Sequence, residues 1–450
     1  MRKAKANNRI LAGLSLVAMI GLAVSCSKNG STNNTPSGPK PADATHIYVQ
    51  DSAFKAYLQA NVCPDAFDAD GRLDVNNAEV TGFTGKMQFD STSKIQSLKG
   101  IAYFTKMSKL ILQSTMVDSL DLSSAMAVDT IRLMDNLDLQ YVNVNGCNSM
   151  RYIRFSNIPV RSMDLSNLAA LNTISGISCA RLNSLKVDND GNLQHILCSG
   201  LSAVATINTS TCPNLQRLYM EYGSALTSLN LKNNSNLKGL LVTYASSFKT
   251  VDLSGNPLLA VVGFDDSGVD SIDYSHNPQL FSIAMPFTPV RNLNLQGNPK
   301  VCILALDGCN YLKTLDLRAQ THADFWYASY AVVSKNYTIS RADLYELYPD
   351  GFFGAPVQTA VCNQHGVATR KINGDPGDLF GGIRVPQYLD VSGLSLTNIK
   401  VNDAIKNNYS FVMARRTAGL VPPPVVTVYA ADQTTVLCND YDPLNEVCNQ

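Results

Sequence analysis

This 450-residue sequence contains few charged residues. Only 16% of its residues are charged, and the 36 Lys and Arg residues balance 36 Asp and Glu residues, which gives a formal net charge of zero. No basic tract stands out along the chain. Proteins that bind nucleic acids rely on clustered Lys and Arg to neutralise phosphates, so the composition disfavours that class of partner.

The sequence also lacks the usual catalytic and metal-binding motifs. It contains no GxSxG, Walker loop, dinucleotide fingerprint or HExxH, its five His residues are scattered, and no CxxC spacing occurs. We therefore expect a protein that is not an enzyme and has no cofactor, apart from the calcium candidate described below. A hydrolase with a site in the C-terminal region is the remote alternative.

Long apolar runs are confined to the N-terminus. Basic residues precede an apolar stretch, Ile10–Val24, and Cys26 follows small residues at the place where a lipoprotein signal peptidase cleaves. We expect residues 1–26 to be a lipoprotein signal peptide with lipidation at Cys26, the alternative being an ordinary secretory signal. Residues 27–43 are polar and predict a flexible tether. The expected location is the cell envelope, as an outer-membrane lipoprotein facing the cell surface and attached to the membrane by its lipid.

A short repeat organises the chain. The segment TVDLSGNPLLA at 250–260 has apolar residues at positions 2, 4 and 10 and Asn at position 7, and this pattern returns every ten or eleven residues over 109–320. Self-similarity at a fixed period is the signature of a solenoid. Positions 2 and 4 alternate with polar positions, which predicts a strand with one buried face. Two units then form one coil, giving two opposed parallel sheets without helices.

Position 7 of the repeat is expected to face inward at the turn. Several units carry Cys instead of Asn there, namely Cys147, Cys179, Cys212 and Cys309, and we expect small buried thiols rather than disulfides. Cys438 and Cys448 are close enough in sequence for a disulfide that closes a loop. The sequence leaves Cys63 and Cys362 undecided.

Alternate units separate two faces of the solenoid. One set has Asp, Asn or Lys at position 3 almost throughout, which predicts a solvated polar ladder. The other set is heterogeneous and more apolar, and aromatic residues near Arg are favoured in ligand faces. The alternative is that this face packs under a flanking domain. The candidate ligand-binding residues on the heterogeneous face are Arg132, Arg154, Arg217, Tyr219, Glu221, Tyr222 and Tyr244.

Residues 44–108 form the expected N-terminal cap. Residues 47–58 predict a short strand leading into an amphipathic helix, and 65–79 resemble a degenerate EF-hand-like calcium loop. With Gly71 at the sharp turn, Asp68, Asp70 and Asp74 fall at ligand positions, whereas two other anionic positions are lost. Calcium binding and a metal-free capping loop are both open, and the losses favour the second.

The register of the repeat stops after residue 317, and 321–450 predict a C-terminal cap and a small β domain. The segment 321–334 holds the only Trp and is expected to cover the end of the solenoid. Several short strand-like segments between 382 and 439 suggest a sandwich-like arrangement.

The segment IQSLKGIAYFTKMSKL, together with the SLDLS that soon follows, resembles Bacteroidetes-type leucine-rich-repeat surface lipoproteins, an internalin-like group with nested ten- and eleven-residue repeats. The resemblance covers about residues 47–317. It implies a mainly β, leucine-rich-repeat parallel-β solenoid that binds a protein or glycan ligand in recognition or adhesion. The alternative is a structural partner of an outer-membrane complex, with recognition by the C-terminal domain.

Overall fold

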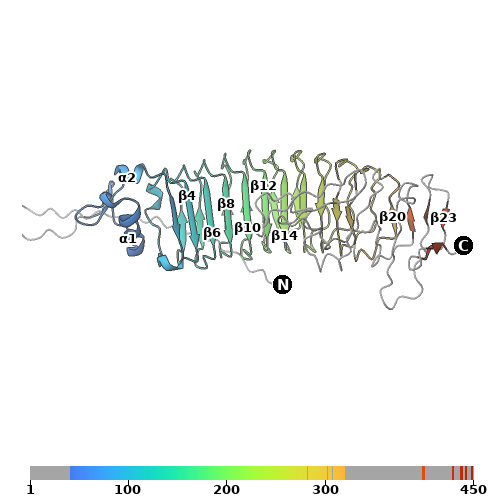
Figure 1. Ribbon diagram of the computed structural model, residues 1–450, viewed down its shortest axis with the longest axis horizontal. Helices are drawn as coiled ribbons and strands as arrows, with labels where there is room; N and C mark the ends of the chain where they lie inside the picture. The colour runs from blue at the N-terminus through green and yellow to red at the C-terminus, as the bar shows by residue number, and fades with distance from the viewer. Residues whose placement is uncertain are drawn as a thin grey trace, which may run out of the picture. The chain divides into compact units, whose positions relative to one another are not determined.

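The structure, a computed structural model, describes residues 41–319 except 281, 302 and 307, together with five short strands after residue 397 (Figure 1). The chain divides into two units, Met1–Pro41 and Ala42–Gln450. Cys26 and nearly all of the expected tether therefore lie outside the described residues, as do most of residues 321–450. Within the described part, no helix has both the length and the apolar character needed to cross a membrane.

The N-terminal cap contains the two α-helices of the described residues. Strand β1 (His46–Ile47) precedes α1 (Ser52–Asn61), as expected, and β1 pairs with β2 (Leu73–Asp74). Helix α1 begins after Asp51, whose carboxylate accepts a hydrogen bond from the N–H of Phe54 at 2.8 Å. Helix α2 (Ala78–Thr81) and the 3-10 turns η1 (Pro64–Ala66), η2 (Ser91–Ser93) and η3 (Ile101–Tyr103) complete the cap.

A parallel sheet of eleven strands begins with a strand of the cap, and its strands lie side by side in chain order (Figure 1). Each strand comes from every second repeat unit, so neighbours pair with a register of about 22 residues, for example Tyr219 with Leu241. The strands are β3 (Lys86–Phe89), β4 (Lys109–Gln113), β6 (Thr130–Met134), β8 (Tyr152–Ser156), β10 (Thr173–Ile177), β12 (His195–Ser199), β14 (Arg217–Glu221), β16 (Gly239–Val242), β17 (Val261–Gly263), β18 (Ser282–Ala284) and β19 (Ile303–Ala305).

The units between these strands form the opposite face. Its strands are short and pair in twos, as β5 with β7, β9 with β11, and β13 with β15. No helix occurs between residues 109 and 319 in the part of the chain described. The predicted fold, a mainly β leucine-rich-repeat solenoid with two opposed parallel faces, is confirmed. These strands are β5 (Ser119–Asp121), β7 (Tyr141–Asn143), β9 (Ser162–Asp164), β11 (Ser184–Lys186), β13 (Thr206–Asn208), β15 (Ser228–Asn230) and β20 (Thr314–Asp316).

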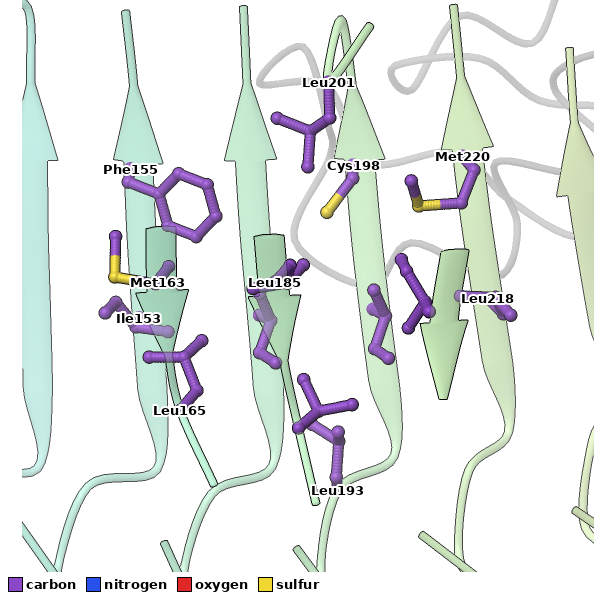
Figure 2. Packing of buried hydrophobic residues seen from close by; sticks show 14 of the residues in the cluster. Ile153, Phe155, Met163, Leu165, Leu185, Leu193, Cys198, Leu201, Leu218 and Met220 are labelled. Carbon is purple, nitrogen blue, oxygen red and sulfur yellow. The ribbon is translucent and has the colours of Figure 1, made fainter. Parts of the chain in front are cut away.

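The core lies between the two faces and is built from repeat positions 2, 4 and 10. Figure 2 shows Ile153 and Phe155 of β8 in one layer with Met163 of the opposite strand β9. All three are at most 1% exposed. Burying such side chains contributes about 1.5–3 kcal/mol each, which makes the stacking of coils the main source of stability.

Position 7 faces inward, as expected. The side-chain amide of Asn256 donates hydrogen bonds to the carbonyls of Leu231 and Asn234 at 3.0 and 2.9 Å, and that of Asn277 repeats the pattern one coil later. Cys147 and Cys212 replace Asn as buried free thiols, and their Sγ atoms donate to carbonyls of the preceding coil. The prediction of structural thiols is confirmed for these positions.

Beyond residue 319 the structure describes β21 (Asn398–Lys400), β22 (Val428–Tyr429), β23 (Val436–Cys438), β24 (Tyr441–Asp442) and β25 (Val447–Cys448). Strand β21 pairs in parallel with β20, and β22 pairs in parallel with β21. The repeat face therefore continues into the C-terminal segment. Most of the region expected to form a sandwich-like domain lies outside the described residues, so that prediction stays open.

Candidate functional site

The outward side of the eleven-stranded sheet is the surface on which most of the sequence-predicted ligand residues fall. Positions 2 and 4 of each strand point into the core, so position 3 points away from it. Cross-strand pairing aligns these position-3 residues in one row, which we call the outward row. Its members are Gln88, Ile111, Arg132, Arg154, Ser175, Leu197, Tyr219, Leu241, Gly263 and Ala284.

The N-terminal half of the outward row carries two adjacent arginines. Arg132 is exposed and Arg154, its neighbour on the next strand, is partly buried. The guanidinium carbon of Arg132 lies 5.8 Å from the ring centre of Tyr152, within the range of a cation–π contact. The Nε of Arg154 is buried and has no hydrogen-bond partner in the described part of the chain. An unsatisfied buried donor is costly, and an acceptor supplied by a ligand would relieve that cost.

The C-terminal half of the outward row is apolar and buried. Leu197, Tyr219 and Leu241 are 8%, 0% and 1% exposed, yet none belongs to the hydrophobic core cluster. Glu221, at the end of the same strand as Tyr219, is 2% exposed, and Arg217 at its start is partly buried. The sequence predicted exposed aromatic side chains here, and the structure instead gives Tyr219 a buried ring.

Tyr222 and Tyr244 lie just beyond the ends of β14 and β16 and stack on each other. Their ring centres are 4.5 Å apart with an angle of 8° between the planes, and Tyr222 is 41% exposed. Both residues have a left-handed backbone, with φ of 53° and 52°. Corresponding residues of other coils, such as Asp135 and Asn157, share this conformation, which Asn and Asp tolerate better than Tyr. The structure therefore brings these two candidate residues into contact.

His195 adds an electrostatic feature to the outward side. Burial lowers its pKa to about 4, and the nearby positive charge of Arg217 acts in the same direction. His195 is therefore neutral at pH 7. Its Nδ1 is buried and has no hydrogen-bond partner in the described residues. The repeat pattern does not predict this burial, because position 1 carries Lys, Thr, Tyr and Arg in other strands of the sheet.

The regular polar ladder on the opposite face has a local structural cause. The side chain of Asp252 accepts a hydrogen bond from the N–H of Ser254 at 2.9 Å, and this bond to the second residue onward recurs from coil to coil. It closes the turn after each short strand, which explains why Asp or Asn is used so regularly. Ser254 also holds the pKa of Asp252 below its ordinary value, chiefly through hydrogen bonds. The same bond is made by Asp121, Asn143, Asp164, Asn208, Asn230, Asp273 and Asn294.

The degenerate calcium loop is held together by an arginine. Asp68 accepts hydrogen bonds from the backbone N–H groups of Asp70 and Arg72, and its second oxygen lies 2.8 Å from the guanidinium group of Arg72. Asp74 accepts from the N–H of Asn76 at 2.9 Å, and Gly71 makes the sharp turn at φ 71°. The side chain of Arg72 therefore supplies positive charge to Asp68. Calcium binding and a metal-free capping loop, the alternative that the sequence favours, both stay open.

Within the described residues, no group of three or more His, Cys, Asp or Glu side chains is placed to hold a metal ion. Cys438 ends strand β23 and Cys448 ends β25, but their side chains lie outside the described part of the structure. Their disulfide stays a prediction.

No protein-family model matches the chain, and no curated protein matches it. Among solved structures, the chain is similar to the functional domain of InlJ from Listeria monocytogenes, described as including a cysteine ladder, at 16% identity and a TM-score of 0.23, covering 54% of this chain and 69% of that one. An internalin (inlF) from Listeria monocytogenes matches at 14% identity and a TM-score of 0.33, covering 63% and 93%. TLR13 in its complex with ssRNA13 matches at 12% identity and a TM-score of 0.21, covering 77% and 59%. No conclusion about a ligand follows from these values.

Proposed function

We propose that this chain is a non-catalytic recognition module of the cell envelope, anchored through a lipid on Cys26, that binds a protein or glycan ligand with the outward side of its eleven-stranded sheet. The observation that carries the proposal is the contrast between the two sides of that sheet. Its inward positions are uniformly apolar, whereas the outward row changes chemically from strand to strand. A uniform core with a varied outer row suits a rigid scaffold that presents specific contacts.

The basic half of the outward row is the part most suited to contact a ligand. Arg132 and Arg154 are adjacent, Arg132 lies over the ring of Tyr152, and Arg154 has an unsatisfied buried donor. Arg and Tyr are enriched among residues that dominate binding energy. Because the charges are positive, an acidic surface on the ligand would accelerate association at low salt.

The test is binding of residues 27–450, the mature chain without its lipidated Cys26, to arrays of glycans and extracellular proteins, beside the variant R132E/R154E. A charge-matched control, K232E/K249E, changes exposed lysines in turns next to the opposite face. We expect the first variant to lose binding and the control to keep it. Equal binding by all three proteins would remove the outward row as the recognition surface. Incorporation of labelled palmitate that Cys26→Ala abolishes would test the anchor.

Docking into an outer-membrane assembly is the second candidate function. The pairing of β20 with β21 favours it, since it connects residues 398–400 directly with the last repeat strand. Deletion of residues 321–450 distinguishes the two functions. Ligand binding that survives the deletion supports recognition by the repeats, whereas loss of binding by a folded, truncated chain supports recognition by the C-terminal region.

A further inference from the structure

One repeat unit of the first half is shorter than both of its neighbours on the same face. Five residues, 157–161, connect β8 to β9, whereas six connect β6 to β7 and six connect β10 to β11. The turn of the short unit carries Pro159. Because the coils are stacked in register, one missing residue leaves a gap that the longer turns on each side border.

The gap appears in the structure as two hollows on either side of this turn. One, of about 380 Å³, opens towards β7 and β9, and the other, of about 290 Å³, lies between Leu137 and Ala180 of the two longer turns. Pro159 and Arg181 line both. The larger volume is within the range of small-molecule sites.

Two arginines give the larger hollow its charge. Arg161 and Arg181 are exposed, and neither guanidinium group forms an ion pair or hydrogen bond with any residue the structure describes. The only carboxylate in the lining, Asp164, accepts a hydrogen bond from the N–H of Ser166 and lies 3.8 Å from the amino group of Lys186. The two arginines are therefore available to a carboxylate on a ligand, which a guanidinium group can hold with two parallel hydrogen bonds.

The remaining lining combines an aromatic ring with amide groups. Tyr141 is 56% exposed, and Gln140, Asn143 and Asn145 lie beside it. An aromatic ring offers an apolar surface to the C–H groups of a sugar ring, while amides exchange hydrogen bonds with its hydroxyls. An acidic peptide would use the arginines but would leave the platform of Tyr141 and the amides without a matching role.

We propose that this hollow binds a carboxylated sugar residue of a glycan, with Arg161 and Arg181 holding the carboxylate and Tyr141 packing against the ring. The site goes beyond the recognition function proposed above, because it uses residues on another side of the solenoid. The proposed sugar site does not depend on Arg132 or Arg154.

The experiment is isothermal titration calorimetry of the mature chain with sialyllactose and trigalacturonate, each beside its neutral counterpart, lactose and galactotriose. We expect at least one carboxylated sugar to bind about tenfold or more tightly than its counterpart, and R161A/R181A to lose that preference. The matched control R151A removes an exposed arginine that does not line the hollows and should bind as the parent does.

A second variant fills the gap without removing charge. Insertion of one Ala after Pro159 restores an eleven-residue unit and should weaken sugar binding while Arg161 and Arg181 are still present. Circular dichroism checks that each variant is folded. The proposal is overturned if neither carboxylated sugar binds, if neutral sugars bind equally, if R161A/R181A keeps the preference, or if hexaglutamate binds in place of the sugars. R132E/R154E should leave sugar binding unchanged, so failure of the proposed function and of this site are separable.

Discussion

Replacing Asp190 by Asn should stabilise the protein, and increasingly so as the pH rises. Asp190 occupies repeat position 7, where Asn136, Asn234 and Asn256 occur in other coils. It is 0% exposed, one oxygen accepts a hydrogen bond from the N–H of Leu168 at 2.8 Å, and the other has no partner in the described residues. Desolvation raises its pKa from 3.8 to about 7.

The direction follows from proton linkage. Between about pH 4 and 7 the native state holds a proton on Asp190 that the unfolded state has released, so stability falls as the pH rises through this window. A shift of about three pKa units corresponds to about 4 kcal/mol. Relaxation of the protein around a buried charge reduces this penalty, and we expect about 2 kcal/mol at pH 8. Asn keeps an oxygen for Leu168 and, as at Asn256, adds an N–H donor for carbonyls of the preceding coil.

The assay is urea denaturation of the parent chain and of D190N between pH 4 and 8. The difference in unfolding free energy should be smallest at pH 4 and about 2 kcal/mol larger at pH 8. D138N, at an exposed position, should show no such growth. A difference that is the same at pH 4 and pH 8 would show that burial of the Asp190 carboxylate has no such cost.

Three further predictions concern the core and the outward side. Asn256→Ala should destabilise by about 1–3 kcal/mol because it removes two buried hydrogen bonds made by the side-chain amide, whereas the exposed Asn233→Ala should cost at most about 0.5 kcal/mol, as measured by denaturation. Burial raises the pKa of the Cys147 thiol to about 12, so a maleimide should leave it unmodified in the native protein and react after unfolding; rapid native labelling would contradict its buried placement. His195, with its pKa lowered to about 4, should show no imidazole titration by NMR between pH 5 and 8, and a midpoint near 6.5 would refute its burial beside Arg217.

The sequence predicts the inside of the solenoid well because the inside repeats. Each coil must bury the same positions against its neighbours. The register alone therefore predicts that Leu218 and Met220 on β14 are buried, and that Asn256 faces inward at the turn of a later unit. The division into two faces follows from the same parity. For Asp121 and Asp252, the sequence predicts exposure to solvent but not the hydrogen bonds that their side chains accept from the turn.

The outer surface is less predictable because its residues do not recur in the same form from one coil to the next. The burial of Tyr219 depends on contacts outside the core, which the pattern of the strand does not contain. The ten-residue unit 152–161 is visible in the sequence. That a hollow forms beside Pro159 follows only from the positions of the neighbouring turns, which the sequence does not show. The pairing of Asn398 with Thr314 likewise had a signal, since Ile399 and Val401 repeat the alternation of a strand after a long interruption.

The most direct test of the central claim is hydrogen exchange of the mature chain with and without the ligand that the arrays identify. Recognition by the basic half of the outward row predicts slower exchange in β6 and β8, around Arg132 and Arg154, on binding. Protection confined to the polar turns after β5 and β7, or to residues after 319, would contradict the claim and place recognition elsewhere.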